Sequence, residues 1–386
     1  MTERRGPRLR FMQVLLLVTG TTHATFALAA TEAMRLLGVH SAGLWGVSLA
    51  LALVFAFHLQ LRRLFPDRPR SAFTLHLIEE PYFAHWCAAL GACVPIALYG
   101  IVKAIASSVR GLPFEPPTTF ALVAYLAALS LAVWGVFVRR RWVTTRKLDL
   151  VIPGLPREFD GYRVAQLSDL HIGGLTPRRW GEAWADISNA AAPDLVVVTG
   201  DMVSSGVGFH DDIAQVIGRL RADDGVFVSM GNHDYFGDGE PLVTLLRAKG
   251  IIVLRNEGTT LARGDARLFV AGVDDTWTRR ANLHQTLEGR TPGAFTLLLA
   301  HDPALFLEAA KQGANLVLSG HTHGGQVAIP FFPKLLSLGK LAHRFHLGLY
   351  REGDATLYVH PGLGTTGPPI RLGVAPEVAI FTLRTA

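Results

Sequence analysis

Four long apolar segments in the first third of the chain constrain its fold more than any other feature. The segments are residues 11–30, 42–61, 82–106 and 118–138, and none contains an acidic residue. A helix of about 20 mostly apolar residues spans the hydrocarbon core of a bilayer. Residues 1–141 are therefore predicted to form an all-α bundle of four transmembrane helices. A soluble protein would have to bury four such helices in series, which is a much less favoured alternative.

Basic residues flank these segments unevenly, and the asymmetry predicts their orientation. One side of the predicted membrane carries Arg4, Arg5, Arg8, Arg10, Arg62, Arg63, Arg68, Arg70, Arg139, Arg140, Arg141, Arg146 and Lys147. The other side carries only Arg35, Lys103 and Arg110. Because cytoplasmic flanks are enriched in Lys and Arg, both termini are expected in the cytoplasm. The sequence thus predicts a multi-pass protein of the inner (plasma) membrane with a cytoplasmic C-terminal domain.

The first apolar segment also admits a second interpretation, as a cleaved signal peptide. Arginines precede it, and Ala27-Leu28-Ala29 resembles a cleavage site. If it were removed, the three remaining spans would begin outside and still deliver the C-terminal domain to the cytoplasmic side. Both interpretations therefore predict the same location for that domain.

Charge and cysteine content narrow the classes of partner. The formal net charge is +6 and the pI is about 9.5, which suits either nucleic acid or an anionic membrane surface. Much of the arginine excess lies beside the apolar segments, and no aromatic-interleaved basic stripe occurs, so membrane lipids are expected and nucleic acid is not. Cys87 and Cys93 are the only cysteines, and both lie in one apolar segment. A disulfide framework and a cysteine-built zinc site are excluded.

From residue 148 onward, apolar strands end in loops that carry Asp, His or Asn. The five strands and their loops are residues 163–167 with 168–173, 195–198 with 199–201, 225–230 with 231–234, 296–300 with 301–303, and 315–319 with 320–325. Carboxylate, amide and imidazole groups are ligands for divalent metal ions. Since α/β sheets place their ligands at the carboxyl ends of strands, the five loops predict one metal site.

Spacing within the loops predicts how these side chains converge. In extended backbone, residues i and i+2 share a face, so Asp169 is expected beside His171, and His321 beside His323. Glycines at positions 200, 231 and 320 would let the backbone turn sharply and approach the ions. Asp201 is the best placed carboxylate to bridge two cations. Two ions about 3.5–4 Å apart could activate a shared hydroxide and bind phosphoryl oxygens.

With these five blocks in order, the sequence resembles the calcineurin-like metallophosphoesterases, and within them a bacterial membrane-associated branch. The resemblance covers residues 148–383 and extends to Ile-Pro-Gly-Leu-Pro at 152–156, to Ser-Gly-His-Thr-His-Gly-Gly-Gln at 319–326, and to the segment 362–371. It implies an α+β catalytic domain, residues 148–386, folded as a four-layer α/β/β/α sandwich with a dimetal site between the sheet edges.

The resemblance also implies a role for each position of the motifs. The first ion would be held by Asp169, His171 and His323, the second by Asn232, His301 and His321, and Asp201 would bridge them. His233 would stabilise the phosphoryl group or protonate the leaving oxygen, with Asp234 orienting it. The cofactors would be two divalent ions, either Mn, Fe, Zn or Ni.

A few other polar residues receive weaker assignments. Arg371 could contact a substrate phosphate, although an ion-paired or solvated arginine is commoner. Asp274 and Asp275 fit a turn as well as a position behind the metal ligands. The remaining histidines of the domain lie outside the five strand-end blocks and are expected on the surface or in loops; they are His210, His284, His343, His346 and His360.

Together these features predict a membrane-anchored, dimetal-dependent phosphoester hydrolase of the phosphodiesterase or pyrophosphatase type, acting through a metal-bridging hydroxide. The membrane segments suggest a lipid or lipid-linked phosphate as substrate, and some relatives in this broad family cleave the pyrophosphate of a UDP-linked acylated sugar. Two alternatives remain open: a general phosphodiesterase that is merely anchored, and a non-catalytic membrane sensor or scaffold that binds a phosphorylated ligand. The sequence does not specify the oligomeric state.

Overall fold

A computed structural model describes residues 5–64, 68–329 and 332–386. Arg4 lies outside the described residues, as do the side chains of Arg5, Arg8, Arg10, Arg62 and Arg63. The chain divides into two compact units, Met1–Phe65 with Ser71–Val138 and Pro66–Arg70 with Arg139–Ala386.

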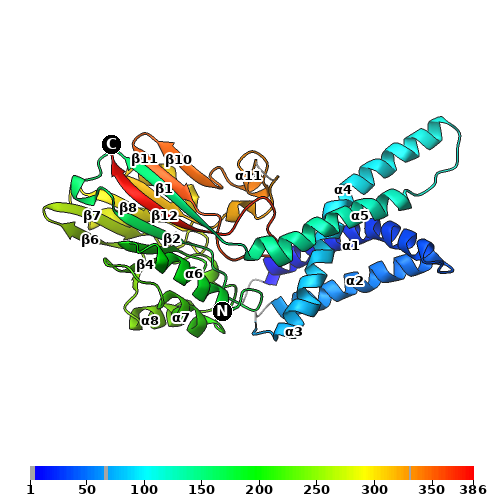
Figure 1. The fold of residues 1–386 in the computed structure, drawn as a ribbon, viewed down its shortest axis with the longest axis horizontal. Helices are drawn as coiled ribbons and strands as arrows, with labels where there is room; N and C mark the ends of the chain where they lie inside the picture. Colours follow the sequence, from blue (N-terminus) through cyan, green and yellow to red (C-terminus); the bar gives the residue numbers. More distant parts are fainter. Residues whose placement is uncertain (1–4, 65–67, 330–331) are drawn as a thin grey trace. The chain divides into compact units, whose positions relative to one another are not determined.

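The first unit is entirely helical. Its elements are α1 (Arg5–Leu36), α2 (Ala42–Leu64), α3 (Ala72–Thr74), the π-helical turn η1 (Leu75–Glu79), α4 (Glu80–Val109), α5 (Thr118–Val133) and the π-helical turn η2 (Trp134–Val138) (Figure 1). Four helical stretches are long and apolar enough to cross a membrane: Met12–Leu36, Ala42–Gln60, Ala72–Val109 and Thr118–Arg141. The four spans expected from the sequence are therefore present, and the third begins ten residues earlier than expected.

Small side chains let these helices pack closely. Ala29 on α1, Ala50 on α2, Ala89 on α4 and Ala121 on α5 are all buried in one cluster. Without a hydrophobic driving force in lipid, helices associate through close van der Waals contact of this kind. Many of the large apolar side chains of this unit are exposed, as expected for a surface that faces lipid.

The second unit contains two six-stranded mixed sheets. The first has the order β1-β12-β2-β3-β4-β5 and the second the order β10-β11-β9-β8-β7-β6. The strands of the first sheet are β1 (Thr144–Ile152), β2 (Arg163–Leu167), β3 (Leu195–Thr199), β4 (Val226–Ser229), β5 (Ile252–Leu254) and β12 (Glu377–Thr385). Those of the second are β6 (Glu257–Arg263), β7 (Ala266–Gly272), β8 (Phe295–Leu299), β9 (Leu316–Ser319), β10 (Gly348–Glu352) and β11 (Ala355–Val359).

Helices cover the outer faces of both sheets, which gives four layers. One core lies between the sheets and joins Val164 and Phe227 of the first sheet to Leu297 of the second. The opposite face of the first sheet packs against α6 (Arg178–Ala190), α7 (His210–Ile217) and α8 (Glu240–Ala248), which Figure 1 shows together beside it. The opposite face of the second packs against α9 (Leu283–Glu288) and α10 (Phe306–Lys311). The predicted α/β/β/α sandwich is confirmed.

Strand direction brings the polar loops together. β2, β3 and β4 run parallel to one another, as do β8 and β9, so within each sheet their carboxyl ends lie at one edge. The buried Gln166 on β2 donates hydrogen bonds to Thr199 Oγ1 on β3 (2.9 Å) and to the Ser319 carbonyl on β9 (3.0 Å). This side chain ties the two sheets together directly behind the loops that follow them.

Candidate metal centre

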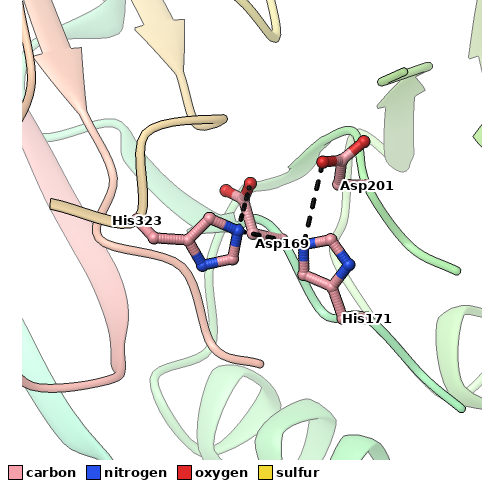
Figure 2. A group of neighbouring side chains, drawn as sticks. All are labelled: Asp169, His171, Asp201 and His323. Atoms are coloured by element: carbon pink, nitrogen blue, oxygen red, sulfur yellow. Dashed lines mark hydrogen bonds and ion pairs between the residues drawn. The ribbon is translucent and has the colours of Figure 1, made fainter. Parts of the chain in front are cut away.

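Two groups of metal-ligand side chains meet where these strands end. Asp169, His171, Asp201 and His323 form the first group, with one ligand atom of each within 4.8 Å of all the others. Figure 2 shows the four side chains pointing toward one another. The Nε2 atoms of His171 and His323 are 3.0 Å apart, and His323 Nε2 is 3.4 Å from Asp169 Oδ1. Such convergence of nitrogen and oxygen donors suits a cation between them.

The second group shares a carboxylate with the first. It consists of Asp201, His301 and His321. Asp201 Oδ2 lies 3.3 Å from His301 Nε2 and 3.7 Å from His171 Nε2, so one oxygen atom faces both groups. His301 is oriented by a hydrogen bond from Nδ1 to the Thr199 carbonyl (2.7 Å), which leaves Nε2 free for the centre. The position of Asp201 between the groups is the one a bridging ligand requires.

Asn232 completes the set of predicted ligands. Its side chain is buried, and Oδ1 has no hydrogen-bond partner among the described residues. Its two neighbours in sequence border the centre, because an added Cβ on Gly231 would lie 2.4 Å from Asp201 Oδ1, and the His233 amide donates to the same oxygen (2.8 Å). A buried amide oxygen without a partner is unfavourable unless it binds something else, and a metal ion would satisfy it.

The ligand loops are turns, which corrects the reason given above for their convergence. Asp169, His171, Asp201, His321 and His323 all have positive φ, between 45° and 70°, and they are five of the ten such non-glycine residues in the described chain. Pairs at i and i+2 therefore meet through left-handed backbone, not along an extended strand. This conformation costs about 1–2 kcal/mol per residue and persists only where the surroundings enforce it, as at functional sites.

Burial prepares the nitrogen ligands for a metal. It lowers the pKa of His171 to about 3 and that of His321 to about 4, so both rings are neutral with a lone pair available. Burial would also lower the pKa of His301, but the Asp201 carboxylate outweighs it and raises that pKa to about 10. Ion binding must displace this proton, because only the neutral ring is a ligand. The donor set of carboxylates, imidazoles and one amide fits two divalent ions.

Gly320 illustrates how closely the backbone packs against the centre. An added Cβ would lie 1.9 Å from Ser168 Oγ and 2.3 Å from Asp169 Oδ2, so the metal loop of residues 320–325 would have to move. We expect Gly320→Ala to lower metal content and activity by at least about tenfold, which isothermal titration with Mn²⁺ and a hydrolysis assay would measure. Gly289→Ala is the matched control, since φ is −76° there and the nearest atom lies 4.0 Å away. Normal Mn²⁺ affinity in Gly320→Ala would contradict the tight packing.

His233 and Asp234 differ from the arrangement expected from the sequence. His233 Nδ1 bonds to the Ser204 carbonyl (2.7 Å), and its ring centroid is 4.6 Å from that of His171. Asp234 does not orient this ring; its carboxylate accepts hydrogen bonds from the amides of Met202 (2.8 Å), Val203 (3.1 Å) and Gly231 (2.9 Å). Asp234 thus fixes the backbone of two ligand loops, and Ser204 orients His233.

Arg371 is fully buried, and its position argues against the substrate contact suggested above. Its guanidinium donates hydrogen bonds to the carbonyls of Pro361 (2.9 Å) and Gly364 (3.1 and 2.6 Å). Burial lowers its pKa to about 9, while the Asp169 carboxylate favours the charged form. Arg371 therefore holds the loop after β11 next to the metal centre. Three of its five N–H groups donate to carbonyls of that loop, and the side chain is fully buried, away from the surface that a substrate phosphate would reach.

Three further residues border the centre without having been predicted there. The rings of Trp277 and His343 each lie 5.5 Å from that of His321, and Gln166 links the sheets as described above. Of these three residues, only Gln166 could have been noticed in the sequence, because it is a lone polar residue inside an apolar strand. His346 and His360 lie in loops, as expected, although both are buried. His210 is buried at the start of α7, which corrects the expectation of a surface or loop position. Asp275 accepts a hydrogen bond from the Thr278 amide (2.6 Å), as in a turn.

The fold and the buried Asp/His centre define a metal-dependent hydrolase of the phosphoesterase class, and comparison with known proteins agrees. The family model for calcineurin-like phosphoesterases matches residues 162–325. A metallophosphoesterase of Bacillus subtilis, YkuE, is 33% identical over 236 residues, which is 60% of this chain and 82% of the relative. The chain belongs to the calcineurin-like metallophosphoesterase family.

Two animal relatives are named as transmembrane proteins. The transmembrane protein with metallophosphoesterase domain of Danio rerio is 32% identical over 279 residues, 69% of this chain and 63% of the relative. The Bos taurus protein of the same name is 30% identical over 281 residues, 68% of this chain and 62% of the relative. The chain spans slightly less than two thirds of the length of these two proteins. Its family therefore includes transmembrane members.

Proposed function

We propose that residues 148–386 form a catalytic unit that hydrolyses a phosphodiester or pyrophosphate bond, anchored by a membrane unit of residues 1–141. The observation that carries the proposal is Asp201 Oδ2 facing two ligand groups at once, within 3.7 Å of a histidine from each. We assign the first ion to Asp169, His171 and His323, the second to Asn232, His301 and His321, and the bridge to Asp201. A buried, preorganised set of this kind supports catalysis, beyond binding of a phosphorylated ligand alone.

The expected steps of catalysis are assigned to different residues of the chain. Two divalent ions bound here would supply Lewis-acid stabilisation of the phosphoryl charge and an activated water. His233 is partly exposed, and its Nδ1 donates to a carbonyl, so Nε2 is the atom that can give a proton to the leaving oxygen. Asp234 and Arg371 keep the ligand loops in place through backbone hydrogen bonds. His233 thus acts on substrate, while Asp234 and Arg371 are positioning residues.

The membrane unit supports a lipid or lipid-linked phosphate as the substrate class. Four candidate spans join directly to a phosphoesterase domain, and the arginine-rich flanks favour the cytoplasmic side of the inner membrane for that domain. An enzyme tethered at this surface meets lipid phosphates at high effective concentration. We therefore favour a membrane lipid over a soluble nucleotide.

Metal stripping and a substrate survey test this proposal. Purified protein treated with chelator should lose hydrolysis of bis(4-nitrophenyl) phosphate, and Mn²⁺ should restore it, because the ions supply most of the transition-state stabilisation. Membrane lipid extracts incubated with the Mn²⁺ protein and analysed by mass spectrometry should lose a phosphate-containing species. Hydrolysis that persists unchanged after the metal is removed would overturn the proposal.

A further inference from the structure

The segment between the metal loop and β10 exposes an unusual amount of apolar surface. We define the apolar segment as the described residues 327–329 and 332–346, which include α11 (Leu338–Ala342). Six of its large apolar side chains are between 51% and 85% exposed: Ile329, Phe332, Leu335, Leu336, Leu338 and Leu341. Exposed apolar side chains concentrated in one short segment are typical of a site of interaction with protein or lipid.

Among the described residues, the rest of the catalytic unit has no similar concentration of exposed large apolar side chains. Its other exposed large apolar side chains are dispersed along the chain, at Trp142, Val151, Val207, Phe236, Ile252, Trp277 and Leu349. Single exposed apolar residues are normal on soluble proteins. The apolar segment is therefore a local feature of one connection in an otherwise ordinary surface.

The apolar segment contacts the metal loop of residues 320–325 at several points. An added Cβ on Gly325 would lie 2.1 Å from the backbone nitrogen of Gly339, so the start of α11 packs directly on the loop. At the end of the segment, Thr322 Oγ1 donates to the His346 carbonyl (2.7 Å), and the His343 ring approaches that of His321. A partner that binds the exposed side chains of the apolar segment would therefore lie close to His321, one of the ligands assigned to the second ion.

The charge of the segment indicates which kind of partner it fits. No acidic residue occurs between Gln326 and Arg351, whereas Lys334, Lys340 and Arg344 are all exposed. Apolar side chains combined with basic ones are typical of segments that lie in the interface of an anionic bilayer. An apolar protein partner would not require this one-sided charge.

The covalent structure also keeps a bilayer within reach. The fourth candidate span ends at Arg141, and β1 begins at Thr144. Two intervening residues can span only about 10 Å even when extended. If the fourth candidate span crosses a bilayer, the first strand of the catalytic unit begins within about 10 Å of the end of that span.

We propose that the apolar segment is a membrane-docking surface, which inserts its leucines into an anionic leaflet and presents lipid-borne phosphates to the metal centre. Docking itself depends only on the exposed surface and its charge. The delivery of substrate rests on the phosphoesterase function proposed above, so the two parts are tested separately.

Lipid-dependent fluorescence quenching tests the docking. The full chain, with Cys87 and Cys93 replaced by Ala, would carry a bimane label at Leu336→Cys or, as control, at Ile252→Cys on β5. In vesicles of phosphatidylcholine and phosphatidylglycerol, spin-labelled lipid should quench the label at position 336 and spare that at 252. A label at 336 that aqueous iodide quenches instead would place the segment in water and overturn docking. A label shielded from both quenchers would mean that protein covers it, from the same chain or a second copy, and would equally overturn docking.

Matched chromogenic substrates test the delivery. The variant Leu335→Ser/Leu336→Ser/Leu341→Ser should lose at least about tenfold in kcat/KM on 4-nitrophenyl hexadecyl phosphate in vesicles, because its leucines no longer hold the segment in lipid. It should keep normal activity on the soluble 4-nitrophenyl methyl phosphate, and Leu349→Ser should match the parent on both. Equal losses on both substrates would show a merely structural role and overturn delivery. If the parent protein hydrolyses neither ester, the proposed phosphoesterase function fails, while the quenching result still decides docking.

Discussion

Asp201→Asn is expected to lower metal-dependent hydrolysis of bis(4-nitrophenyl) phosphate by about a thousandfold or more, the loss typical of removing a group central to catalysis. Asp201 Oδ2 faces His301 at 3.3 Å and His171 at 3.7 Å, so this carboxylate is the only described side chain shared by both ligand groups. An amide carries no charge and is a poorer bridge between two cations. Steady-state kinetics with saturating Mn²⁺ would measure the loss.

The same substitution should leave the fold intact, which makes the result interpretable. Asp201 Oδ1 accepts a hydrogen bond from the His233 amide (2.8 Å), and the carbonyl oxygen of Asn can accept it as well. Circular dichroism should therefore match the parent protein. Asp186→Asn is the control, because Asp186 is an exposed partner of Arg219 at 2.6 Å on the outside of the domain. Activity retained in a folded Asp201→Asn protein would remove the basis for a shared carboxylate.

His233→Gln is expected to lower kcat by about 10²–10⁴ while leaving metal content unchanged, since proton transfer by a positioned side chain contributes a factor of this size. The His233 backbone amide holds Asp201, and that contact survives any change of side chain. The ring itself is fixed by Ser204 with Nε2 left free, and glutamine cannot deliver a proton from that position.

The dependence on the leaving group separates proton transfer from simple positioning. An alkoxide leaving group needs a proton, whereas 4-nitrophenolate leaves readily without one. The loss in His233→Gln should therefore be larger for a dialkyl phosphate than for bis(4-nitrophenyl) phosphate. His284→Gln serves as control because this histidine is exposed and pairs only with Glu288 on the surface. A uniform loss on both substrates, or a loss of bound metal, would count against a role as general acid.

The elements of the catalytic domain follow from local sequence because each buried strand is a short apolar run. Strands such as β3 (Leu195–Thr199) are buried along their whole length, and the polar residues that follow them begin the loops. Parallel pairing of these strands then places the loops that follow them at the same edge of each sheet. The same argument places Asp169 and Asp201 at one edge of the first sheet and His301 at one edge of the second, and the packing of the two sheets then brings these edges together.

The roles of individual side chains in the metal centre could not be predicted from the sequence, because they depend on the surrounding tertiary structure. Left-handed backbone at Asp169 and His171 is stabilised by surrounding loops, and no local pattern indicates it. Asp234 bonds to amides some thirty residues away. Arg371 binds carbonyls of its own loop, but its complete burial depends on the surrounding elements and is not indicated by the local sequence. His343 reaches His321 through an irregular connection whose path has no periodic signal.

The third membrane span shows a different limit. Hydropathy places its start at Tyr82 because two glutamates and a proline precede that residue, yet the helical stretch begins at Ala72. Glu80 is buried, and His76 Nδ1 lies 2.8 Å from its carboxylate. A buried, paired acid can continue a helix that composition alone would end.

The number and position of bound metal ions test the dimetal centre most directly. Elemental analysis of the Mn²⁺-loaded protein, combined with anomalous scattering from its crystals, should show two ions per chain, one on each side of the Asp201 carboxylate. A single ion, or ions bound away from Asp201, would contradict the assignment of these seven ligands to a two-ion centre.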